Sequence, residues 1–72
     1  MPIKNNLKDF RSKLNINQQE FGACVGVSRQ TISLIERGDY SPSVTLALKI
    51  AKYFGVKVED IFYYEEEENE KC

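Results

Sequence analysis

Three side chains of the kind that hydrogen-bond nucleic-acid bases lie close together at Arg29, Gln30 and Ser33. A guanidinium fits the O6 and N7 acceptors of guanine, a glutamine amide fits N6 and N7 of adenine, and serine bonds either base. On a helix, where successive residues turn by about 100°, the three positions share one face. The pattern is typical of base reading in a major groove, and equally typical of the solvated face of an ordinary amphipathic helix.

The helix that carries these side chains has a recognisable start, stop and packing face. Ser28 is a residue type that caps a helix, which predicts a helix from Arg29 to about Arg37, and Gly38 stops it. Ile32 and Ile35 fall opposite the polar face. We therefore expect one side of this helix to pack and the other to stay exposed.

A second helix is predicted immediately before it. Asn17 and Glu20 have the spacing of a capping box, so this helix begins at Gln18, and Gly26 ends it where a positive φ is needed. Gly22 is placed where a small residue lets two backbones approach. The segment is thus a helix, a tight turn and a helix.

Three further helices complete the predicted fold. Their expected spans are about Asn6 to Lys13, a helix capped by Ser43 and ended by Gly55, and about Val58 to Phe62. The two ends of this body are β-prone. Ile3 and the run 61–64 either pair as short strands or simply cover the helical core.

Composition bounds the class of protein. Seventy-two residues allow one small core, and no stretch has the length of an apolar membrane span or the form of a signal peptide. There is no histidine, and the two cysteines, Cys24 and Cys72, have neither metal nor disulfide spacing. We therefore expect a cytoplasmic protein that is not an enzyme and that has no metal, cofactor or small-molecule ligand.

Charge is unevenly divided along the chain. Residues 65–72 hold five glutamates and one lysine, a charge of −4, so residues 1–64 carry +3. A mildly basic body fits a nucleic-acid partner. We expect residues 1–64 to form one domain and residues 65–72 to be an acidic disordered tail.

Several segments together resemble the helix-turn-helix of the phage-repressor (Cro/Xre) family of transcriptional regulators. They are Asn17-Gln18-Gln19-Glu20-Phe21-Gly22, Val25 to Ser33, Ile35-Glu36-Arg37-Gly38, Tyr40-Ser41-Pro42-Ser43, Leu46 to Ala51, and Glu59-Asp60-Ile61-Phe62. The resemblance covers about residues 5–62. It implies an all-α, compact five-helix domain of the lambda-repressor type that binds operator DNA, commonly as a dimer.

The resemblance also implies roles for individual residues. Base readout falls to Arg29, Gln30 and Ser33, with Ser28 and Thr31 at the groove edge. Phosphate contacts fall to the following residues: Gln18, Arg37, and the main chain from Gly38 to Tyr40. Arg11 matches a basic position that pairs with the acid at Glu36, which is a structural role.

Three positions depart from the family's pattern. Asp39 stands where a neutral or basic residue is common, which weakens the phosphate contact there. Gly22 replaces the usual alanine. Leu34 occupies a position that is often polar, where it either touches a thymine methyl or is a part-exposed apolar residue.

The most concrete function that these patterns predict is a sequence-specific double-stranded DNA-binding repressor of transcription. It would bind a palindromic operator as a homodimer joined through Ile61, Phe62, Tyr63 and Tyr64, the apolar run left over from the helical stripes. One rival keeps the fold but has another protein as its main partner, as in an antitoxin-like adaptor. A small enzyme or metal protein is the second rival, which the composition disfavours.

Overall fold

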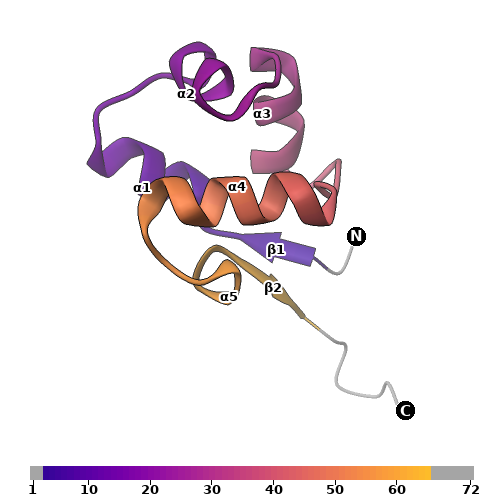
Figure 1. Cartoon of the computed structure of the whole chain (residues 1–72). Coiled ribbons are helices and arrows are strands. Elements are labelled where there is room, and N and C mark those ends of the chain that lie inside the picture. The colour runs from indigo at the N-terminus through magenta and orange to yellow at the C-terminus, as the bar shows by residue number, and fades with distance from the viewer. Residues whose placement is uncertain (1–2, 66–72) are drawn as a thin grey trace.

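The computed structural model describes residues 3–65, which form five helices and a two-stranded antiparallel sheet (Figure 1). In chain order the elements are β1 (Ile3–Asn5), α1 (Leu7–Lys13), α2 (Gln18–Val25), α3 (Arg29–Glu36), α4 (Val44–Phe54), α5 (Val58–Ile61) and β2 (Phe62–Tyr64). The five predicted helices are confirmed. The predicted acidic tail falls on residues 65–72, and residues 66–72 lie outside the described part of the chain.

Local side-chain caps start the helices where the sequence predicts. The Oδ1 of Asn17 accepts from the Glu20 amide at 2.7 Å, and the Glu20 carboxylate accepts from the Asn17 amide at 3.0 Å. The hydroxyls of Ser28 and Ser43 cap α3 and α4. These bonds satisfy backbone amides that the first helical turn leaves without partners. The capping box and both serine caps are therefore confirmed.

The two ends of the described chain pair as strands. Ile3 lies opposite Tyr64, and Lys4 lies opposite Tyr63, in an antiparallel ladder. The predicted last helix is one residue too long, because Phe62 has the extended backbone φ −112°, ψ 134° and begins β2. Of the two alternatives for the chain ends, strand pairing is confirmed, and the ends cover the core as well.

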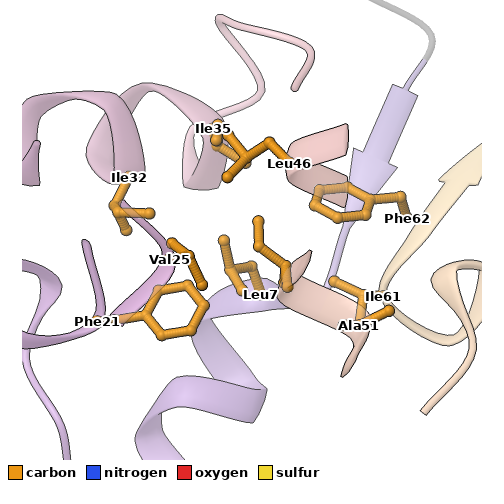
Figure 2. Packing of buried hydrophobic residues seen from close by; sticks show 10 residues of the cluster. Leu7, Phe21, Val25, Ile32, Ile35, Leu46, Ala51, Ile61 and Phe62 are labelled. Atoms are coloured by element: carbon orange, nitrogen blue, oxygen red, sulfur yellow. The ribbon is translucent and has the colours of Figure 1, made fainter. Parts of the chain in front are cut away.

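The core is a single cluster that draws on six of the seven elements (Figure 2). Its buried members are Leu7, Phe21, Val25, Ile32, Ile35, Leu46, Ile50, Ala51, Ile61 and Phe62. Two of these, Ile61 and Phe62, belong to the predicted dimer seam. That prediction is wrong for both side chains, because they are 0% and 8% exposed inside the protein's own core.

Close packing of α2 against the turn that follows it depends on Gly22. A Cβ on Gly22 would lie 2.6 Å from the Val27 carbonyl oxygen, closer than two such atoms can approach. The same turn is closed by a bond of 2.8 Å from the Val27 amide to the Gly22 carbonyl. Gly26, at φ 82°, then reverses the chain in the left-handed region.

We expect Gly22→Val to destabilise the protein by about 3 kcal/mol, because the branched side chain must push α2 away from this turn. Thermal unfolding followed by circular dichroism measures the effect. Ala23→Val is the matched control, since Ala23 is the exposed neighbour on the same helix and loses only helix propensity. Equal losses in the two variants would contradict the importance of the close approach.

Candidate nucleic-acid interface

Helices α2 and α3 present one polar surface, formed by the exposed side of α3 and the start of α2. The predicted base-reading residues Arg29 and Gln30 are both exposed in the first turn of α3, and Ser33 is half-buried on the same face. Ile32 and Ile35, on the opposite face, are 0% and 1% exposed. Packing of those two isoleucines orients α3, so the polar face is held outward on a rigid element.

Two predicted groove-edge residues also stabilise the start of α3. Ser28 Oγ accepts from the Thr31 amide at 3.2 Å and lies 3.1 Å from the Thr31 hydroxyl. Thr31 is half-buried, whereas Ser28 is exposed. These hydroxyls therefore position the first turn of α3, and they lie beside Arg29 and Gln30 in sequence and in space.

A part-buried polar network links α1, α2 and α3 behind this surface. The Arg11 guanidinium donates to the Glu36 carboxylate through Nε at 2.7 Å and Nη2 at 3.1 Å, and through Nη1 to the Ile16 carbonyl at 2.9 Å. The hydrogen bond to Glu36 raises the pKa of Arg11 above its ordinary value, with burial opposing this. The predicted pair between Arg11 and Glu36 is confirmed.

Gln18 also belongs to this network, a contact that the sequence does not predict. Its Nε2 donates to Glu36 Oε1 at 3.0 Å. One amide hydrogen is thereby committed to Glu36, while the second hydrogen and the carbonyl oxygen stay available. No local pattern signals this contact, because Gln18 and Glu36 are 18 residues apart and meet only when α2 packs on α3.

A shallow hollow opens where the N-termini of α2 and α3 converge. It has a volume of about 410 Å³ and is lined by Arg11, Asn17, Gln18, Gln19 and Arg29. The N-terminus of α2 points its positive end at this place, which favours a bound anion such as a DNA phosphate.

The turn after α3 departs from the predicted phosphate contact in one respect. The amides of Gly38 and Asp39 donate to the carbonyls of Ile35 and Leu34, each at 2.9 Å, so both close the end of α3. They are not free to hold a phosphate. The exposed Arg37 and Tyr40 side chains remain available, although Arg37 Nε lies 3.5 Å from Asp39 Oδ2.

Leu34, the apolar residue on an often polar position, is half-buried on α3. This fits a part-exposed apolar side chain and leaves the thymine contact a prediction.

Within residues 3–65, no group of three or more His, Cys, Asp or Glu side chains could hold a metal ion. Across the same residues, no helix is long and apolar enough to cross a membrane.

Comparison with known proteins identifies the family to which this chain belongs. Residues 7–61 match the family model described as helix-turn-helix, and the chain belongs to this Cro/Xre-type family of DNA-binding transcriptional regulators. Members of this class are DNA-binding proteins and not enzymes.

Two similar proteins are named as transcriptional regulators. The chain is 56% identical over 66 residues to an uncharacterized HTH-type transcriptional regulator of Methanocaldococcus jannaschii, covering 92% of this chain and 100% of that protein. It is 31% identical to the cryptic phage CTXphi transcriptional repressor RstR of Vibrio cholerae, over 76% of this chain and 50% of RstR.

A solved structure extends the likeness to a complex with DNA. The P22 c2 repressor, crystallised with a synthetic operator, superposes with a TM-score of 0.71 at 32% identity. The match covers 74% of this chain and 80% of the repressor chain. The five-helix, repressor-type fold is thus confirmed.

Proposed function

We propose that this protein is a cytoplasmic repressor of transcription that reads a palindromic operator as a homodimer. The main observation in support is the opposite exposure of the two faces of α3. Arg29 and Gln30 are exposed in its first turn, and Ile32 and Ile35 are buried on the other face. In this proposal Arg29, Gln30 and Ser33 meet base edges in the major groove, and Ser28 and Thr31 lie at its rim.

In this proposal, side-chain contacts to the DNA phosphates hold the protein in register on the duplex. Gln18 offers its free amide hydrogen to a phosphate beside the start of α2, and Glu36 fixes the orientation of that amide. Arg37 and the Tyr40 hydroxyl meet the phosphates past the end of α3. Such contacts carry no sequence information, and the charged contact from Arg37 makes the affinity depend on salt.

Selection of bound duplexes from a random DNA pool tests the function directly. A recovered palindrome with half-sites about 34 Å apart, centre to centre, supports both the operator and the dimer. A single unpaired site supports DNA reading by a monomer. Absence of enrichment would contradict the proposal and favour the protein-adaptor rival.

The homodimer is proposed through the exposed part of β2. With Ile61 and Phe62 in the core, the seam reduces to Tyr63 and Tyr64, which are 44% and 56% exposed. A single module has three or four base-reading side chains, so specificity over a genome favours two copies. Tyrosine buries a large area at an interface with little loss of side-chain entropy.

We expect Tyr64→Ser to weaken the dimer at least tenfold, because a central tyrosine at an interface contributes more than 1 kcal/mol. Sedimentation equilibrium at micromolar concentration measures the dissociation constant. Leu48→Ser, on α4, is the matched control because Leu48 is also 56% exposed. If only Leu48→Ser weakens the dimer, the interface lies on α4 instead of β2. If the parent protein is monomeric, a preformed dimer is contradicted.

A further inference from the structure

A second hollow lies between β1 and the end of α3, together with the turn that joins α3 to α4. Its volume is about 320 Å³, and its lining includes Lys4, Arg37, Asp39 and Tyr63. Lys4 and Tyr63 are directly opposed in the β1–β2 ladder, so their side chains project from the same face of the sheet. Strand pairing therefore brings a lysine from the chain's beginning beside Arg37 at the end of α3.

Lys4 and Arg37 bring two cationic hydrogen-bond donors to this hollow, and its lining also holds the carboxylates of Glu36 and Asp39. An ammonium and a guanidinium are groups that contact phosphate oxygens in protein–DNA complexes. Arg37 is already a proposed phosphate contact, so the hollow continues that contact beyond the end of α3.

Carboxylates face both cations in the free protein. Asp39 Oδ2 lies 3.5 Å from Arg37 Nε, and Glu65 Oε1 lies 3.9 Å from Lys4 Nζ. All four side chains are at least half exposed. Exposed ion pairs contribute little free energy, so a phosphate can displace either carboxylate. Glu36, the remaining acid of the lining, is already bonded to Arg11 at 2.7 Å.

We propose that this hollow binds a phosphate of the DNA backbone through Lys4 and Arg37, and that Glu65 and Asp39 occupy these cations until DNA displaces them. The inference rests on the proposed function and extends its footprint to the sheet. Two carboxylates then set the strength of sequence-independent binding. Lys4, which precedes the helix-turn-helix by 14 residues, becomes a DNA-binding residue.

Charge-neutralising variants of the full chain test the proposal. We expect Glu65→Gln and Asp39→Asn each to tighten binding about two- to threefold at low salt, equally for the selected operator and for a random duplex. The gain should fade as salt screens exposed charges. Glu59→Gln, an exposed glutamate on α5, changes the net charge equally and should leave affinity nearly unchanged.

Lys4→Gln gives the complementary test, measured as the slope of log K against log salt concentration. Loss of one phosphate contact should make this slope about 0.9 less steep. An unchanged slope, or equal tightening by Glu59→Gln and Glu65→Gln, would overturn the proposed hollow. If the parent protein selects an operator and Lys4→Gln shows the same salt slope as the parent, this inference alone is overturned. If the parent enriches no duplex, the proposed function is overturned as well.

Discussion

Arg29→Ala should lose discrimination at one base pair in each half-site while keeping most of its affinity for random DNA. A bidentate contact to the correct base contributes about 1–3 kcal/mol of discrimination, so the preference should fall roughly 5- to 150-fold at that position. Gln30→Ala should relax a neighbouring base pair. Both side chains are exposed, so neither variant should change the melting temperature appreciably.

Repeating the duplex selection with each variant gives the measurement, and two control variants separate readout from charge and position. Lys52→Ala removes the same charge from the exposed surface of α4 and should leave base preference intact. Gln19→Ala removes an exposed glutamine from α2, beside the proposed phosphate contact Gln18, and is the matched control for Gln30→Ala. An unchanged preference in Arg29→Ala would show that the exposed face of α3 does not read this base.

The Arg11→Met variant should lose about 3–5 kcal/mol of stability, because it leaves the Glu36 carboxylate buried without its cation. The side chains of Arg11 and Glu36 are 13% and 5% exposed, and the Gln18 amide is the donor that remains on Glu36 when the guanidinium is removed. For a domain of this size, such a loss lowers the melting temperature by about 12–40 °C. The double variant Arg11→Met, Glu36→Leu should recover much of it.

Arg37→Met is the matched control for the network. It breaks an arginine–carboxylate pair as well, but its two side chains are 62% and 60% exposed, so the loss should stay below about 1 kcal/mol. Thermal unfolding of the four proteins checks the series. Similar losses in Arg11→Met and Arg37→Met, or no recovery in the double variant, would contradict a buried network.

The network should also show a defined dependence on pH. Because the folded pKa of Arg11 lies above its ordinary value, the arginine contributes fully at every pH below that ordinary value. Its contribution is lost only as pH rises through the higher folded pKa, in strongly alkaline solution. The stability difference between the parent and Arg11→Met should therefore show no alkaline decline between neutral pH and about pH 9, as urea unfolding can measure.

Helices and their faces could be predicted because their determinants are local. A cap such as Asn17 acts on an amide three residues away, and Ile32 and Ile35 define the packed face of α3 by their spacing alone. The family was predicted from a resemblance carried by residue types and spacings in segments that span most of the chain. Arg29 and Gln30 could likewise be placed on the exposed face, since no distant contact was needed to orient them.

Long-range packing decided the rest. Strand pairing joins Ile3 to Tyr64, and it draws Phe62 into the core where the sequence alone suggested an exposed interface. The partner of Gln18 and the hollow at Lys4 also depend on elements that meet only in the folded chain. The sequence by itself determined which helices form and which face each exposes, because those choices are made within a few residues. The tertiary structure decided which polar groups are already engaged, because burial and partners depend on segments far apart in the chain.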